Sequence, residues 1–188
     1  MLTRWLAALS LFLVLPPCGN ATELAKALQS PHYVLLMRHA YAPGVGDPPH
    51  YALDRCEGQR LLNDDGKQQA ARIGDWLRAQ GVHSAKVLSS IWCRCTETAN
   101  LLGFGGVSID PSLGSFFDEP SRAASQNTAL RGLLARALSG KGESALILVT
   151  HHVNIAEFTG ENIGSGDMVL AHIGPQGQLV DFRLYPSP

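Results

Sequence analysis

The sequence lacks an excess of charge of either sign. Its 188 residues include 15 Lys and Arg and 16 Asp and Glu, which gives a formal net charge of −1. Proteins that bind nucleic acid or an anionic membrane surface usually display a marked basic excess, so the totals favour neither partner. Any anionic ligand must therefore be held by a local cluster of cationic side chains.

The chain also lacks an apolar run that is long enough to cross a membrane comfortably, and it shows no internal repeat. The uncharged apolar stretch over residues 5–15 follows Arg4 and leads into two prolines and then small residues up to Ala21, whereas a membrane helix needs about 20 residues. This three-part pattern predicts a secretory signal peptide over residues 1–21, cleaved after Ala21. A lipid anchor on Cys18 is the competing interpretation, which Pro17 disfavours because lipoprotein processing takes a small residue there.

Cysteine is scarce, and after residue 21 only Cys56, Cys93 and Cys95 remain. An exported protein meets an oxidising compartment, so we expect one disulfide and one free thiol. Cys93 and Cys95 are too close in sequence to bridge each other easily, which predicts that Cys56 pairs with one of them. A zinc site is the alternative, and it is disfavoured because the Cys-x-Cys pair has no matching second pair.

The composition, by contrast, supplies what a folded domain needs. With 45% hydrophobic and 16% charged residues, the chain can build a core, and its length suits a single domain over residues 22–188. Apolar runs at 33–37, 87–88 and 145–149 predict buried strands. The patterns between them predict helices at 63–80, 93–102 and 121–139, with shorter helices at 22–28 and 154–159. With a short strand at 107–109 and a terminal hairpin at 168–184, the order predicts a layered α/β domain with a largely parallel sheet.

The stretch from 41 to 62 is rich in Pro and Gly, which forbids regular structure there. A loop of this length inside a compact domain usually has a function or acts as a lid. Cys56 lies within it, so a disulfide would tie the loop down.

Polar residues follow each of the three predicted central strands. Arg38-His39 ends the first, Ser90 and then Arg94 follow the second, and His151-His152 ends the third. The carboxyl ends of parallel strands lie at one edge of a sheet, where open α/β folds bind their ligands. Arginine forks match phosphate oxygens, and Arg94 falls in the first turn of a predicted helix, where backbone N–H groups also face an anion. The sequence therefore predicts an anion site at this edge.

The spacing of these groups resembles that of the histidine phosphatase superfamily. Arg38-His39-Ala40 is similar to the family signature, residues 90–99 to its second arginine motif, residues 62–70 to its loop-to-helix segment, and Val149-Thr150-His151 to its second histidine. The resemblance covers the chain from about Val34 to Gly160. It implies the phosphoglycerate mutase-like fold, an α/β protein built as a three-layer α/β/α sandwich around a mostly parallel central sheet.

The resemblance also implies roles for four residues. His39 would be the nucleophile that forms a phosphohistidine, and two nearby arginines are consistent with an unprotonated ring. Arg38 and Arg94 would hold the non-bridging oxygens, and His151 would donate to the transferring phosphoryl group. Because arginines and histidines supply the cationic field, the resemblance implies no metal and no cofactor.

The group that protonates the leaving oxygen is not evident. Some family members have an Asp directly after the second histidine, where this chain has His152, and others use a glutamate near the position of Ser115. Asp118, Glu119 and His152 are the candidate proton donors. Arg60 and Arg122, on loops that could frame the pocket, are candidate substrate-binding residues.

We therefore expect an exported, metal-independent phosphatase of the histidine acid phosphatase type. It would be periplasmic or secreted, and it would act on a small phosphorylated substrate or an envelope phosphate group. We expect no nucleic-acid partner and no membrane anchor. The missing proton donor favours one alternative, a phospho-ligand binding module with little turnover. A metal-binding protein that uses His151, His152 and the cysteines is a further hypothesis, which inhibition by chelators would support.

Overall fold

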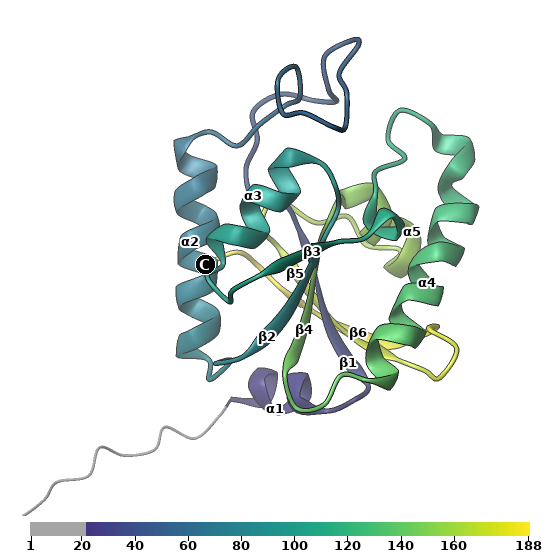
Figure 1. Cartoon of the computed structure of the whole chain (residues 1–188). Coiled ribbons are helices and arrows are strands. Elements are labelled where there is room, and N and C mark those ends of the chain that lie inside the picture. The colour runs from purple at the N-terminus through teal and green to yellow at the C-terminus, as the bar shows by residue number, and fades with distance from the viewer. Residues whose placement is uncertain (1–21) are drawn as a thin grey trace, which may run out of the picture.

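A six-stranded sheet forms the centre of the fold (Figure 1), with the strand order β3-β2-β4-β1-β5-β6. The structure is a computed structural model that describes residues 22–188. The predicted signal peptide, its cleavage position and Cys18 lie outside the described residues. The strands are β1 (Tyr33–Arg38), β2 (Ala85–Ser89), β3 (Val107–Ile109), β4 (Ala145–Thr150), β5 (Met168–Ile173) and β6 (Leu179–Tyr185). The first four run parallel, and the hairpin of β5 and β6 joins β1 in antiparallel fashion, which confirms the mostly parallel sheet.

Helices cover both faces of the sheet, so the predicted three-layer α/β/α sandwich is also confirmed. One face packs on α1 (Glu23–Gln29), α2 (Asp64–Ala79) and α3 (Cys93–Leu101), and the other on α4 (Ala123–Ser139) and α5 (His152–Thr159). Strand β1 is buried on both sides because its side chains alternate: Leu35 and Met37 join the first core, and Val34 and Leu36 the second. None of the described helices is long and apolar enough to cross a membrane.

Two helix starts differ from the prediction. Residues 120–122 form a separate 3-10 turn before α4, where Pro120 cannot donate a backbone hydrogen bond. Helix α5 begins at His152 rather than at Asn154, because the chain turns into the helix directly after the extended residue His151, whose carbonyl accepts from Ile155 N at 3.2 Å. His152 therefore lies in the first turn of a helix.

The sheet register brings the predicted strand ends to one level. Arg38 pairs with Thr150 across β1 and β4, His39 N donates to Thr150 O at 3.0 Å, and Ser90 N donates to Val149 O at 3.0 Å. The three strand ends therefore converge at the upper edge of the sheet in Figure 1, beneath the 41–62 loop.

Candidate active site

A cavity of about 170 Å³ lies at this edge of the sheet, and we call it the site cavity. The ends of β1 and β4 lead directly into His39, His151 and His152, and the first turn of α3 contributes Arg94. The 41–62 loop contributes residues 44–47 and Arg60, and the loop before α4 contributes Ser115, Phe117 and Asp118. The structure thus brings together residues that are more than 100 positions apart in the chain.

His39 is held as a neutral ring with a free nitrogen. It is 1% exposed, and its Nδ1 lies 2.7 Å from Ala40 O. A carbonyl only accepts, so Nδ1 carries the proton. Burial lowers the pKa of His39 well below its ordinary value of 6.5, and the charges of Arg94 and Arg38 lower it further. The neutral ring therefore presents an unprotonated Nε2.

Arg38 and Arg94 each retain an unused donor. Arg38 Nη1 donates to Ile163 O at 2.9 Å, and Arg94 Nη1 donates to Asp47. The Nε atoms of both arginines are buried and have no hydrogen-bond partner among the described residues. A buried N–H without a partner is costly, so an anion that reached either atom would be favoured. Arg38 does not line the site cavity itself, but its charge lowers the pKa of both His39 and His152.

His151 lies beside His39, with ring centroids 5.6 Å apart. Its Nε2 is 2.9 Å from Ser90 Oγ, and its Nδ1 is 3.4 Å from Arg94 Nη2. A guanidinium only donates, so Nδ1 accepts and Nε2 carries the proton. Burial, and then the neighbouring His39 and Arg94, lower the pKa of His151 well below 6.5. The donor role that the resemblance implies therefore requires a second proton, on Nδ1, and a bound anion would favour that proton by raising the pKa.

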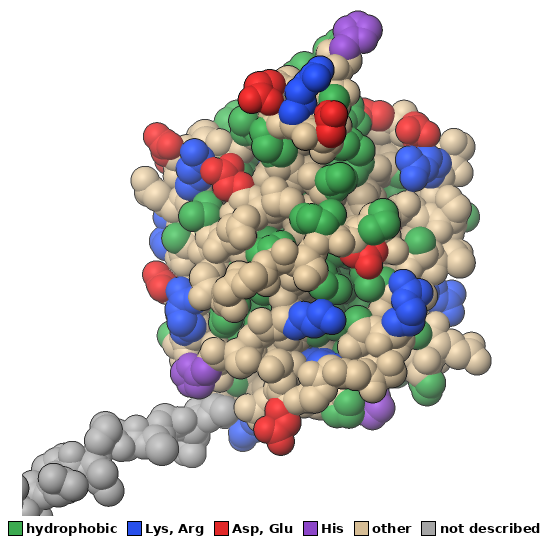
Figure 2. Space-filling view, in the orientation of Figure 1, with side chains coloured by type: hydrophobic (Ala, Val, Ile, Leu, Met, Phe, Trp, Pro, Cys, Tyr) green, Lys and Arg blue, Asp and Glu red, His purple; other side chains and the backbone are tan. Residues whose placement is uncertain are grey.

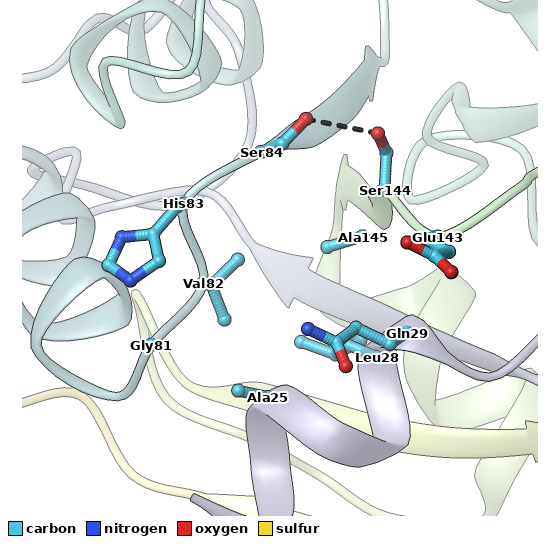
Figure 3. Close-up of a pocket in the computed structure, with 10 residues that line it drawn as sticks. All are labelled: Ala25, Leu28, Gln29, Gly81, Val82, His83, Ser84, Glu143, Ser144 and Ala145. Carbon is cyan, nitrogen blue, oxygen red and sulfur yellow. Dashed lines mark hydrogen bonds between the residues drawn. The ribbon is translucent and has the colours of Figure 1, made fainter. Parts of the chain in front are cut away.

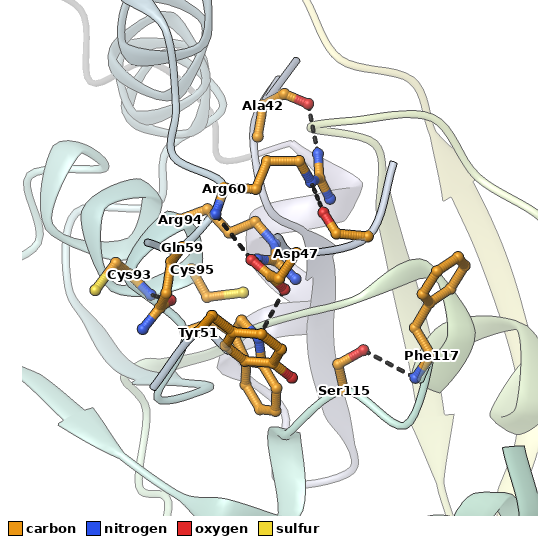
Figure 4. Close-up of polar contacts among 12 residues, drawn as sticks. Ala42, Asp47, Tyr51, Gln59, Arg60, Cys93, Arg94, Cys95, Ser115 and Phe117 are labelled. Carbon is orange, nitrogen blue, oxygen red and sulfur yellow. Dashed lines mark hydrogen bonds and ion pairs between the residues drawn. The ribbon is translucent and has the colours of Figure 1, made fainter. Parts of the chain in front are cut away.

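Asp47 is a residue of the site that sequence reasoning missed. Its carboxylate lies 2.8 and 3.0 Å from Arg94 Nη1 and also accepts from Trp92 Nε1 at 3.1 Å and Arg60 N at 2.8 Å (Figure 4). The side chain is only 2% exposed. The one available signal was that Asp47 is one of three acidic residues in a long Gly- and Pro-rich loop, and no local spacing connects it to Arg94.

The other sequence-based candidates divide into two groups. Arg60, Asp118 and His152 line the site cavity, and Tyr51 Oη donates to Asp118 Oδ2 at 3.3 Å. Glu119 and Arg122 do not line it. They face each other at 3.7 Å, and both side chains are more than half exposed.

The structure pairs Cys56 with Cys93, one of the two pairings that the sequence left open. Cys93 N also donates to Gln59 Oε1 at 3.0 Å, so the disulfide and this hydrogen bond attach the 41–62 loop to the start of α3. Cys95 is a buried free thiol, and burial raises its pKa to about 12. It therefore stays protonated and unreactive at neutral pH.

Because the loop carries Asp47 and Arg60, removing the disulfide should affect both stability and the site. In the double variant Cys56→Ser, Cys93→Ser, we expect a loss of about 3–4 kcal/mol of unfolding free energy, from the chain entropy of a loop of this length. We also expect weaker binding of inorganic phosphate. Urea unfolding and titration calorimetry measure the two effects. As a control, a reductant should reproduce both effects in the natural protein and cause no further change in the double variant. Equal phosphate affinity in the natural protein and the double variant would contradict a role of the 41–62 loop in phosphate binding.

A larger hollow, of about 290 Å³, lies at the amino ends of β2 and β4, far from the convergent strand ends (Figure 3). Its floor includes Leu28 and Val82, and at its rim Ser84 and Ser144 hydrogen-bond to each other at 3.0 Å. No cluster of cationic groups lines this hollow. Anywhere among the described residues, no group of three His, Cys, Asp or Glu side chains is arranged to bind a metal ion. The chemistry of this protein is therefore better sought at the site cavity.

Comparison with known proteins finds a family model that covers part of the chain. Residues 34–114 match the model of the histidine phosphatase superfamily (branch 1), a segment that includes Arg38, His39 and Arg94. No curated protein gives a significant match to the chain.

Solved structures share the fold over most of the chain. A protein histidine phosphatase, SixA, complexed with tungstate is 19% identical over 82% of this chain and 97% of its own, with a TM-score of 0.55. A mycobacterial hydrolase is 16% identical over 83% of this chain and 98% of its own, with a TM-score of 0.62. A mycobacterial glucosyl-3-phosphoglycerate phosphatase complexed with VO3 is 15% identical over 84% of this chain and 100% of its own, with a TM-score of 0.59. The chain is thus similar to the histidine phosphatase superfamily over residues 34–114, and it shares the fold of these solved structures over most of its length.

Proposed function

We propose that the protein is an exported phosphatase that hydrolyses a phosphomonoester through a phosphohistidine on His39, without a metal ion. One observation carries this proposal. The neutral His39, with Nε2 unprotonated, lies near enough to Arg94 and Arg38 for their charges to lower its pKa, and the Nε–H group of each arginine is buried without a partner among the described residues. This arrangement provides a nucleophile and a place for the charge of the phosphoryl group it would attack.

The reaction follows from these groups in two steps. Nε2 of His39 attacks phosphorus, the P–O bond to the leaving group breaks, and the leaving oxygen takes a proton. Water then attacks the phosphohistidine, which releases phosphate and restores the ring. Arg38 and Arg94 offset the charge on the phosphoryl oxygens in both transition states. His151 takes the donor role that the resemblance implies when the bound anion raises its pKa and Nδ1 gains a proton.

Asp118 is the best-placed proton donor. It lines the site cavity, whereas Glu119 is turned outward to Arg122. His152 also lines the cavity, but burial and three arginines lower its pKa, so the ring is neutral and a poor acid at neutral pH. Asp118 receives a hydrogen bond from Tyr51, which fixes the carboxyl group at the mouth of the cavity.

Asp118→Asn should therefore slow hydrolysis in proportion to the need for a proton. We expect kcat to fall about 100-fold for an alkyl phosphate and only a few-fold for an aryl phosphate, whose leaving group departs as an anion more readily. Phosphate release from the two esters measures this difference. Glu119→Asn is the matched control and should leave both rates unchanged. Equal small effects on both esters would exclude Asp118 as the donor.

Several features support an exported enzyme of the histidine acid phosphatase type. The pattern of residues 1–21 is that of a signal peptide, and a disulfide suits an oxidising compartment. A cavity of about 170 Å³ suits a small phosphorylated substrate, or a phosphate group that projects from an envelope glycan or lipid. Figure 2 shows basic and acidic side chains interspersed over one face, without a large basic patch there of the kind that nucleic acid would need.

The proposal is tested by assaying the protein without residues 1–21 against an aryl phosphate. We expect steady phosphate release, an acid-labile phosphoenzyme trapped from labelled substrate, and the same rate in the presence of EDTA. Inhibition by EDTA would instead support a metal-dependent protein. If phosphate raised the melting temperature while no ester was hydrolysed, the chain would be a phospho-ligand binding module.

A further inference from the structure

We infer that Ser90 is a positioning residue, which holds His151 so that the ring can donate to the phosphoryl group. This inference rests on the proposed function, and it assigns a task to a residue that does not line the site cavity. Ser90 follows β2 directly and is fully buried. It therefore acts on the reaction only through a neighbour.

The hydroxyl oxygen of Ser90 is the hydrogen-bond acceptor where it meets His151. Ser90 Oγ lies 2.9 Å from His151 Nε2, and Trp92 N donates to the same oxygen at 3.5 Å. Arg94 faces the other ring nitrogen with a guanidinium that only donates, so Nδ1 accepts and Nε2 carries the proton of the neutral ring. Two N–H groups thus converge on one hydroxyl oxygen, which has two lone pairs to receive them.

The free thiol of Cys95 supports the same position of the proton. Its sulfur lies 3.5 Å from His151 Nε2, and the thiol donates its hydrogen to Thr150 O at 3.7 Å. The sulfur therefore presents lone pairs to the ring nitrogen, although a thiol is a weaker acceptor than a hydroxyl. Because both neighbours of Nε2 accept, they keep its proton in place in either charge state of the ring.

One short segment therefore holds both nitrogens of the His151 ring. Ser90 lies just before α3 and Arg94 lies in the first turn of that helix, so the start of α3 directs both side chains to the end of β4. The indole of Trp92, between them in the sequence, packs edge-on against the imidazole with ring centroids 5.1 Å apart. The four-residue spacing from Ser90 to Arg94 thus orients a histidine that is 61 positions away from Ser90.

The Ser90 acceptor matters most when His151 carries two protons. In the free protein, burial and neighbouring groups lower the pKa of His151, so the ring is neutral. The titratable and charged groups that face it are His39, Arg94, His152, Arg60 and Cys95. A bound phosphoryl group raises the pKa, and Nδ1 takes a proton from solvent. The Nε2–H then belongs to a cation, whose hydrogen bonds are roughly twice as strong as neutral ones, so Ser90 stabilises the donating form of the ring.

The first test compares the ionisation of His151 in Ser90→Ala and in a matched control, Ser89→Ala. Both serines are fully buried, but Ser89 Oγ donates to the backbone carbonyl of Ser90 at 2.8 Å. Nitrogen NMR of the labelled ring follows the ionisation at saturating tungstate, a phosphate analogue that stays a dianion at neutral pH. We expect the pKa of His151 in the complex to be about one unit lower in Ser90→Ala than in the natural protein. Ser89→Ala should leave it unchanged.

The second test is the pH profile of aryl phosphate hydrolysis. If protonated His151 donates to the phosphoryl group, kcat falls as the pH rises past the pKa of that ring in the substrate complex. In Ser90→Ala this fall should begin about one pH unit lower, which makes kcat above it about tenfold smaller. Ser89→Ala should keep the natural profile. A purely structural loss would instead lower kcat by the same factor at every pH.

These outcomes separate the role of Ser90 from the proposed function. The same shift in both serine variants, no shift in Ser90→Ala, or a proton on Nδ1 in the free natural protein would overturn the positioning role. If no ester is hydrolysed, the proposed function fails, and the NMR measurements still decide the role of Ser90. If Ser90→Ala does not fold, the natural protein decides it: a proton on Nε2 supports the role, and a proton on Nδ1 overturns it.

Discussion

His39→Ala should reduce turnover of an aryl phosphate by at least about a thousandfold and abolish the acid-labile phosphoenzyme. The physical reason is that the neutral His39 imidazole has a free lone pair on Nε2 and lies near enough to Arg94 and Arg38 for their charges to lower its pKa. Because burial and the arginines lower the pKa of this ring, it stays unprotonated below pH 6.5. The nucleophile is therefore available through the mildly acidic range as well as at neutral pH.

The measurement combines single-turnover kinetics with trapping of labelled phosphoenzyme. The variant should melt within a few degrees of the natural protein, because alanine leaves the strand and its backbone bonds in place, and it should still bind phosphate through Arg38 and Arg94. His83→Ala, an exposed histidine remote from the cavity, serves as the control and should keep full activity. Turnover and phosphoenzyme that persist in His39→Ala would refute the mechanism.

The second large effect is expected at Arg94, where activity and stability change together. Arg94→Ala removes a phosphate donor, and it also leaves the buried Asp47 carboxylate without its counter-ion. We expect kcat/KM to fall by about 1000-fold or more. We also expect the unfolding free energy to fall by about 3–5 kcal/mol, the cost of breaking a buried ion pair by removing one partner.

A double variant separates the two effects. In Arg94→Ala, Asp47→Ala, the uncompensated charge is gone, so urea unfolding should recover most of the lost stability. Activity should not recover, because the phosphate donor is still missing. If the single variant Arg94→Ala were as stable as the natural protein, the Asp47–Arg94 ion pair would have no structural role. Recovery of activity in the double variant would exclude Arg94 from the reaction.

Much of the site could be predicted because its residues follow buried strands directly. A continuous apolar run such as 145–149 indicates a strand, and the strand's end places the next residues at the sheet edge whatever the rest of the chain does. His39 and His151 are positioned in this way, and Arg94 follows because the helix that carries it starts just beyond β2. The same local patterns set the boundaries of α2, whose cap Asn63 accepts from Gly66 N at 3.0 Å.

The remaining contacts of the site were decided only by the tertiary structure, because they depend on the position of the 41–62 loop, whose sequence has no regular local pattern. Asp47 and Arg94 are 47 positions apart, and nothing in the Gly- and Pro-rich sequence around Asp47 indicates which arginine it meets. The choice of Cys93 over Cys95 as the partner of Cys56 has the same origin: two cysteines in one helical turn point in different directions, and only Cys93 points to the loop.

The sequence by itself thus determined the fold class and the groups that would handle phosphate, because strand periodicity is a local property of the chain. The tertiary structure alone decided the protonation pattern of the two histidines, the outward orientation of Glu119 and Arg122, and the buried carboxylate on Arg94. Each of these depends on burial and on contacts between distant segments, which set the local charge and leave no trace in residue spacing.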